Sequence, residues 1–290
     1  MALRLEPDLL KKLEYLHVVS RRAFAGQHRA DRTSTKRGRG LEFADHRQYS
    51  PGDDFRHIDW NAYKRLNRLL LRLFDEERDL PIYLLLDASR SMSEPARFDQ
   101  AKRISAALCY IALAHLDRVT ILSFSDGMGE EIRPGPGKGR VIRVMDQLDA
   151  LAARGQTDLY TSFRQFASRG RLRGLAVVIS DFLDPAGYER ALKLLSAAGH
   201  EVHAVHVTSR RDRYWDGIGE VRLVDEETGE THDVDVTPSL AEGYARAFDA
   251  RAAALELFCG RYGMGYVRAE AERPFEEIVL HAFRQGRFLA

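Results

Sequence analysis

The sequence predicts an α/β fold: a doubly wound, mostly parallel sheet, preceded by an N-terminal helix and a small β-containing module. The first observation is a set of short apolar runs, each as long as a strand buried on both faces. The second is the helix-length segment between successive runs, which is typical of parallel βαβ units with right-handed crossovers. The third is an ordinary globular composition, with 44% hydrophobic and 30% charged residues among 290. The apolar runs are IYLLLD (82–87), RVTILSF (118–124), LAVVISD (175–181) and EVHAVHV (201–207).

The first predicted element is an amphipathic helix over residues 7–24, with Pro7 suited to its first turn. Its apolar residues recur at helical spacing: Leu9, Leu10, Leu13, Leu16 and Val19. The next stretch, residues 27–40, has no apolar period and carries Arg29, Arg32, Lys36, Arg37 and Arg39 against Asp31. It is therefore expected to be an exposed basic loop.

A small β-containing module is expected between residue 41 and the main sheet. Residues 50–53 (SPGD) suit a turn, and residues 69–74 alternate in a strand-like manner. We therefore divide the chain into an N-terminal region, residues 1–78, and an α/β domain, residues 79–290.

The α/β domain continues with alternating elements. Helices are expected at 98–115 and 141–151, from the GQTDLYTS loop to Arg169, at 188–198, from Pro238 in its first turn onward, and at 274–285. The segment near 220–236 has two alternating runs around Thr228 and Gly229, which predicts an inserted β-hairpin. A last short strand, GYVRA, begins at Gly265.

The overall charge and the cysteines restrict the function classes. The formal net charge is +1, so the total balance does not call for nucleic acid, an anionic membrane or an acidic substrate. Cys109 and Cys259 lie in apolar, helix-like stretches without metal-ligand spacing, as reduced core thiols would. The N-terminus lacks the apolar run of a signal peptide. We therefore expect a soluble, cytoplasmic protein.

Polar residues follow the predicted strands at the edge where ligands bind in doubly wound sheets. The run at 82–87 ends in Asp87 and is followed by Ser89 and Ser91, and the run at 175–181 ends in Asp181. The loop GQTDL adds Thr157 and Asp158. These are hard oxygen ligands, which suit Mg²⁺ in octahedral coordination better than metals that prefer nitrogen or sulfur.

The DASRS stretch, a loop threonine and a strand-end aspartate together resemble the metal-ion-dependent adhesion site of von Willebrand factor A-type domains. This resemblance implies that Ser89, Ser91 and Thr157 contact the ion directly. It also implies that Asp87 and Asp181 act behind them through water.

Upstream, GRGLEFADHRQYSPGDDFRHIDWNAYKRLNRLLLRLFDEE resembles the signature of the DUF58 family, in which a GDD-x-R-x-IDW segment precedes such a domain. Members of that family often carry two N-terminal transmembrane helices, and this sequence has no such segment. The resemblance implies a protein that acts with a MoxR-type AAA+ ATPase.

Several alternatives remain at this point. Ser91, Ser93 and Asp181 could simply cap helices. The segment GDDFRHIDW could be either a partner-facing loop or a turn closed by Asp/Arg pairs, with Trp60 plugging the module against the sheet. The basic loop could bind nucleic acid, although it lacks interleaved aromatics. His200, His203 and His206 are expected to be ordinary core and surface residues, because neighbouring strand positions face opposite ways.

The leading hypothesis is a non-enzymatic, metal-dependent interaction module that binds a carboxylate of a protein partner. The rival is a metal-dependent phosphoester hydrolase, for which Asp158 is the unassigned carboxylate. A serine nucleophile is disfavoured because the GxSxG pattern is absent.

Overall fold

The computed structural model describes residues 8–17, 42–50, 55, 58–75, 81–115, 117–214, 219–225 and 229–284. The chain forms two compact units. One comprises Met1–Ala23 and Leu80–Leu289, and the other comprises Phe24–Asp79. Each unit is described by itself.

The main unit is built on a six-stranded sheet of order β10-β7-β6-β3-β4-β5. Five strands are parallel, which confirms the predicted doubly wound α/β fold, and the edge strand β5 is antiparallel to β4. The sequence did not predict β5. The strands are β3 (Ile82–Asp87), β4 (Val119–Phe124), β5 (Met128–Ile132), β6 (Leu175–Ser180), β7 (Glu201–Thr208) and β10 (Gly265–Glu270).

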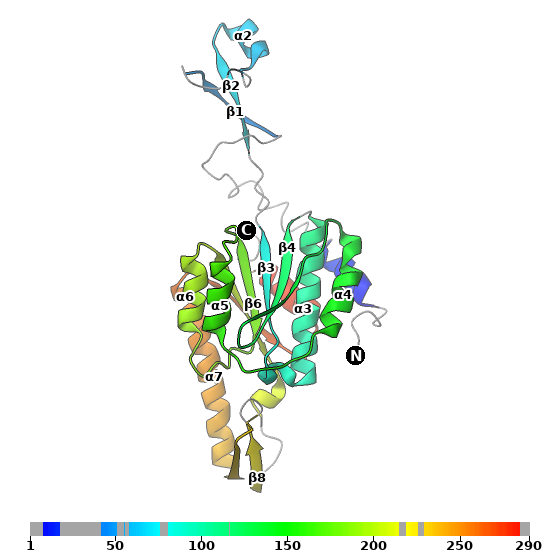
Figure 1. Ribbon diagram of the computed structural model, residues 1–290, viewed down its shortest axis with the longest axis vertical. Helices are drawn as coiled ribbons and strands as arrows, with labels where there is room; N and C mark the ends of the chain where they lie inside the picture. The colour runs from blue at the N-terminus through cyan, green and yellow to red at the C-terminus, as the bar shows by residue number, and fades with distance from the viewer. Residues whose placement is uncertain are drawn as a thin grey trace. The chain divides into compact units, whose positions relative to one another are not determined.

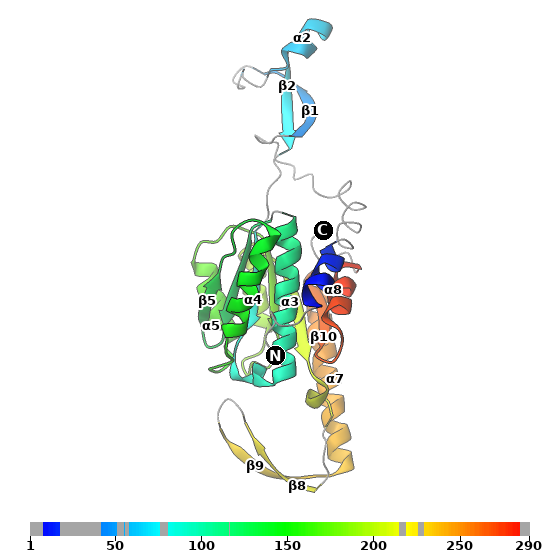
Figure 2. The same cartoon turned by 90° about the vertical axis from the view of Figure 1, so that its right-hand side faces the viewer.

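Helices cover both faces of this sheet (Figures 1 and 2). On one face α3 (Pro95–Ala114) packs on the strands and is flanked by α4 (Val141–Ala150) and α8 (Phe275–Arg284). On the other lie α5 (Leu159–Ser168), α6 (Glu189–Ala197) and α7 (Pro238–Arg261). Because both faces are covered, every residue of β3 and β6 is buried, as their continuous apolar runs predict.

The N-terminal helix, described over residues 9–17, belongs to the main unit. Leu9, Leu13 and Leu16 are buried, Lys12 lies near Glu276 and the ring of Phe275 of α8, and His17 packs against Tyr110. This differs from the predicted division at residue 78, which grouped the helix with the β-containing module. The reason is that its leucine stripe needs an apolar surface, and α3 and α8 provide it.

The second unit contains β structure, as expected. β1 (Glu42–Gln48) and β2 (Leu70–Asp75) form an antiparallel ladder, and a short helix, α2 (Trp60–Leu66), precedes β2. Asp59 caps α2, and Trp60, its first residue, has a side chain that is 57% exposed. The interpretation in which Trp60 plugs this module against the main sheet stays a prediction. The basic loop at 27–40 and most of GDDFRHIDW lie outside the described residues.

An inserted hairpin follows the sheet strand β7, as predicted. β8 (Gly219–Val224) pairs antiparallel with β9 (Thr231–Val236), and Gly229 in the connection has a φ of 76°, while Thr228 lies outside the described residues. The hairpin and the first half of α7 project from the edge where the parallel strands end (Figures 1 and 2).

Both cysteines lie in the core, as the sequence predicts. Cys109 and Cys259 are free and buried, and burial raises the pKa of each thiol to about 12. Within the described part of the chain, none of the helices combines the length and apolar character needed to cross a bilayer.

Candidate functional site

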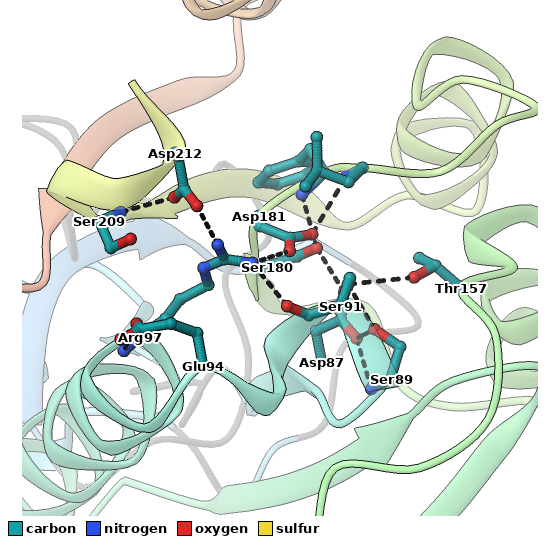
Figure 3. Close-up of polar contacts among 12 residues, drawn as sticks. Asp87, Ser89, Ser91, Glu94, Arg97, Thr157, Ser180, Asp181, Ser209 and Asp212 are labelled. Carbon is teal, nitrogen blue, oxygen red and sulfur yellow. Dashed lines mark hydrogen bonds and ion pairs between the residues drawn. The ribbon is translucent and has the colours of Figure 1, made fainter. Parts of the chain in front are cut away.

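The candidate site lies at the carboxyl ends of β3 and β6, which are neighbours in the sheet. The chain leaves β3 through α3 toward β4 on one side, and leaves β6 through α6 toward β7 on the other. This is the switch point of a doubly wound sheet, where diverging connections open a crevice. Asp87 and Asp181 stand at this point, as the sequence predicts (Figure 3).

Asp87 is the centre of the hydrogen-bond network at this edge. Its Oδ1 accepts bonds from the Ser89 amide at 2.9 Å and the Ser89 hydroxyl at 2.6 Å, while its Oδ2 accepts from the Ser180 hydroxyl at 2.5 Å. All three donors are neutral. Complete burial, followed by the nearby charge of Asp181, raises the pKa of Asp87 to about 7.

Three hydroxyl groups converge beside Asp87. The Ser89 Oγ lies 3.0 Å from the Ser91 Oγ, which lies 3.4 Å from the Thr157 Oγ1 on the loop before α5 (Figure 3). Two backbone bonds hold this loop against the β3–α3 loop: Arg90 N to Gly155 O at 2.9 Å and Arg154 N to Ala88 O at 2.7 Å. The hydroxyls therefore come together from segments that are far apart in the sequence.

The 3.0 Å between the Ser89 and Ser91 hydroxyls matches the spacing of ligands around a small divalent cation, and the 3.4 Å between Ser91 and Thr157 is wider. Adjacent ligands of an octahedral Mg²⁺ ion at roughly 2.0 to 2.1 Å lie about 2.9 Å apart. Among the described residues, no group of three His, Cys, Asp or Glu side chains is placed to hold a metal ion. An ion at this edge would therefore depend on Ser89, Ser91 and Thr157, with carboxylates behind them.

Asp181 completes this edge, but it already has a cationic neighbour. Its Oδ1 accepts the Leu183 amide at 3.1 Å, and its Oδ2 accepts Nη1 of Arg97 at 2.7 Å. Burial raises the pKa of Asp181, while the Arg97 charge and a hydrogen bond from the Ser91 side chain act in the opposite direction. Asp181 therefore interacts both with Arg97 and with the hydroxyl of Ser91.

Arg97 is a site residue that the sequence reasoning missed. From the first turn of α3, its Nη1 also donates to the Ser91 carbonyl at 2.5 Å, and its Nη2 donates to Asp212. Asp212 lies in a short 3₁₀ turn, η5 (Arg210–Asp212), and its other oxygen accepts the Ser209 amide at 2.6 Å. A sequence signal was available for Asp212 alone, because this residue follows β7, another strand that ends at this edge.

Helix capping does not explain the serines. The cap of α3 is Glu94, whose carboxylate accepts the Arg97 amide at 2.7 Å, so neither Ser91 nor Ser93 caps this helix. Asp181 does not cap α6, whose N-cap is Tyr188 without a side-chain bond. The capping alternative is therefore wrong for these three residues.

Asp158 has a structural role instead. Its carboxylate caps α5 by accepting the Thr161 amide at 2.7 Å. The neighbouring Asp184 accepts the Leu159 amide at 2.8 Å and thereby also fixes the start of α5. These caps position Thr157 at the end of its loop.

The three histidines were expected to be core and surface residues, but none of them lies at the surface, because helices cover both faces of the sheet. His200, His203 and His206 are all buried. His203 lies over Gly265, where a Cβ would approach its Nδ1 to 2.2 Å, while His206 packs edge-on against Phe182.

The sequence matches a known protein family and several bacterial proteins. The profile described as "Protein of unknown function DUF58" matches residues 45–254. Uncharacterized proteins of Mycobacterium tuberculosis and Mycobacterium bovis are each 30% identical over 258 residues, which covers 86% of this chain and 80% of theirs. An uncharacterized protein of Mycobacterium avium is 41% identical over 96 residues, which covers 33% of this chain and 56% of that protein.

Solved structures with similar folds include an aerotolerance-related membrane protein of Bacteroides fragilis, which is 16% identical. It has a TM-score of 0.43 and covers 71% of this chain and 99% of its own. A von Willebrand factor type A protein of Catenulispora acidiphila is 14% identical, with a TM-score of 0.36, over 74% of this chain and 43% of its own. Because both scores are below 0.5, the fold assignment depends on the strand order and connections described above.

Proposed function

The chain belongs to the DUF58 family, and we propose that it is a protein-binding module whose binding depends on a divalent cation. In this proposal Ser89, Ser91 and Thr157 hold Mg²⁺ or a similar hard cation, with Asp87 and Asp181 behind them. The observation that carries the proposal is the convergence of three hydroxyls, 3.0 and 3.4 Å apart, beside a completely buried carboxylate.

The chemistry of these ligands favours binding of an acidic partner. Hydroxyl groups are neutral, so they leave most of the charge of a divalent ion uncompensated. A carboxylate from another protein that completes the coordination gains strong Coulomb attraction in a partly dehydrated site. The expected partner therefore presents a Glu or Asp side chain on an exposed segment.

A binding role fits the site better than phosphoester hydrolysis. A hydrolase needs a general base beside the ion, and the carboxylate available for that role from the sequence was Asp158. Its oxygen is engaged by the Thr161 amide at the start of α5, which suits a fixed cap better than a proton acceptor.

The family resemblance extends the proposal to a partner and a compartment. We propose a MoxR-type AAA+ ATPase, or a protein that it remodels, as the source of the carboxylate. A cytoplasmic location fits the two free, buried cysteines, since disulfides are rare there.

The first test is calorimetric titration of the full chain with MgCl₂ and with MnCl₂. We expect saturable binding to the wild type and its loss in a Ser89→Ala/Ser91→Ala double variant. A Ser168→Ala/Ser196→Ala variant, which removes two exposed helical hydroxyls, is the matched control and should bind as the wild type does.

The second test concerns the partner. Purified MoxR-type ATPase should be retained by the immobilised chain in Mg²⁺ and released by EDTA, and the double variant should not retain it. Retention that is unaffected by both EDTA and the double substitution would contradict the metal-dependent interaction.

A further inference from the structure

We propose that Arg97 is a built-in cation of this site, which holds Asp181 when no metal is bound and competes with a bound ion for that carboxylate. This inference rests on the proposed function, because it describes how affinity at the same metal site is set.

The geometry places one guanidinium between three oxygen groups (Figure 3). Nη1 donates to the Asp181 carboxylate at 2.7 Å and to the Ser91 carbonyl at 2.5 Å, and Nη2 donates to Asp212. Arg97 thus contacts one predicted outer carboxylate of the ion and the backbone of one predicted direct ligand.

Burial makes these contacts energetically important. The Arg97 side chain is 8% exposed and that of Asp181 is 2% exposed, so water does little to screen the pair. A guanidinium stays charged in proteins, so its charge persists at this edge across the working pH range. The metal-free site therefore already contains a cation next to one of its carboxylates.

The position of Arg97 on α3 is also fixed. Its amide donates to Glu94 at 2.7 Å in the first turn of the helix, directly after the loop that carries Ser89 and Ser91. The guanidinium is consequently held close to the loop by the backbone as well as by its own contacts.

Competition follows from these charges. An incoming ion requires negative charge behind the hydroxyls, and Arg97 neutralises much of the charge that Asp181 could supply. Binding free energies are reciprocal, so an ion that draws Asp181 toward itself must weaken the Arg97–Asp181 bond by the same amount.

Asp212 makes this exchange possible without leaving a buried charge unpaired. When Asp181 turns toward an ion, Arg97 keeps its bond to Asp212, which is itself fixed by the Ser209 amide. An unpaired buried guanidinium would be costly, so a second carboxylate is the feature that a competing cation needs.

The test compares wild type with Arg97→Gln, which removes the charge but keeps a hydrogen-bond donor. We expect Mg²⁺ and Mn²⁺ affinities, measured by calorimetry and by electron paramagnetic resonance of free Mn²⁺, to rise about tenfold or more. The thermal midpoint in EDTA should fall, and Mg²⁺ should raise it further than in the wild type. Arg143→Gln, at an exposed position of α4, is the control and should change neither quantity.

Two further variants separate charge from geometry. Arg97→Lys keeps the positive charge but lacks the planar, two-pronged donor group of the guanidinium. Its ion affinity should lie within about threefold of that of the wild type. Asp212→Asn leaves Arg97 dependent on Asp181 alone and removes negative charge, so ion affinity should fall several-fold. If Arg97→Gln does not fold even in Mg²⁺, the Asp212→Asn result decides the proposal.

The outcomes distinguish this inference from the proposed function. If the wild type binds the ion and folded Arg97→Gln binds it equally or more weakly, then Arg97 does not compete with the ion. The proposed metal site would still stand. If Arg97→Gln binds the ion and the wild type does not, Arg97 competes strongly enough to prevent ion binding, which supports the inference. If neither protein binds either ion, the proposed metal site is overturned, and the inference falls with it.

Discussion

At the scale of single residues, Asp87 is a buried carboxylate whose hydrogen-bond donors are neutral. It is completely buried, and the donors to its oxygens are two hydroxyls and one amide. Burial and then the nearby charge of Asp181 raise its pKa to about 7, because neutral donors stabilise a carboxylate less than a positive charge does and offset only part of these effects. A cation beside Ser89 would stabilise the ionised form of Asp87, which is why we regard this edge as suited to metal binding.

His200 provides a residue-scale prediction for stability. Its ring packs against Tyr83 and Phe166, and burial lowers its pKa from 6.5. The folded state therefore keeps a neutral histidine at pH values where the unfolded chain binds a proton. Stability from this residue is fully present above pH 6.5 and is lost as the pH falls through that value toward the lower folded pKa.

We expect His200→Phe to reduce the fall in the free energy of unfolding between about pH 7 and pH 5, measured by urea denaturation at each pH. His232→Phe, at an exposed position of β9, is the control and should reproduce the wild-type profile. A profile of His200→Phe that is as steep as that of the wild type would contradict this role.

The residue types of the candidate site could be predicted from the sequence, but their partners could not. Asp87, Ser89 and Asp181 lie next to buried apolar strands, and that position indicated a shared edge. Arg97 gave no such signal, because it stands within a helix and a helical arginine is usually exposed. Its role depends on where α3 begins relative to β6, which is a tertiary feature.

At the scale of elements, the start of α5 separates the two candidate functions. Asp158 caps this helix through the Thr161 amide, and Asn is as good an N-cap as Asp. We expect Asp158→Ala to lower the free energy of unfolding by about 1 kcal/mol and Asp158→Asn to change it by a few tenths.

Chemical denaturation in urea measures both effects, and calorimetry should show that Asp158→Asn still binds Mg²⁺. A general base accepts a proton in the reaction and does not hold the ion, so phosphoester hydrolysis by the wild type that is lost in Asp158→Asn would be needed to favour the hydrolase. If Asp158→Asn abolished ion binding or partner retention while its stability was unchanged, the structural role of Asp158 would be insufficient.

The elements that sequence patterns missed are short or atypical. β5 (MGEEI) is a charged edge strand in which only Ile132 is buried, and charged residues are common where an edge must avoid further pairing. α2 has seven residues, too few to establish an apolar helical period. The buried strands and longer helices were predictable because their apolar runs and spacings are unambiguous over more residues.

At the scale of the whole molecule, the segment Phe24–Asp79 interrupts the main unit in the sequence. The N-terminal helix packs within the main unit before this segment, and β3 begins after it. The ring of His17 lies 5.4 Å from that of His115, and the Ile82 amide donates to the Arg118 carbonyl at 2.8 Å. The two flanks of the segment therefore both reach the region that follows α3.

This arrangement predicts that the main unit folds without the interrupting segment. Replacement of residues 24–79 by a flexible Gly/Ser linker of about 12 residues should leave a cooperative thermal transition within a few degrees of that of the main unit in the full chain. It should also leave Mg²⁺ binding unchanged, because the predicted ligands lie between residues 87 and 181.

The N-terminal helix supplies the contrasting variant. Leu13 is completely buried, so Leu13→Ala should lower the free energy of unfolding by about 2 to 5 kcal/mol both in the full chain and in the linker variant. Equal losses measured by urea denaturation in the two backgrounds would show that the helix stabilises the main unit directly. If Leu13→Ala had little effect in the linker variant but a large one in the full chain, the helix would depend on residues 24–79, and the predicted division at residue 78 would describe the folding units better.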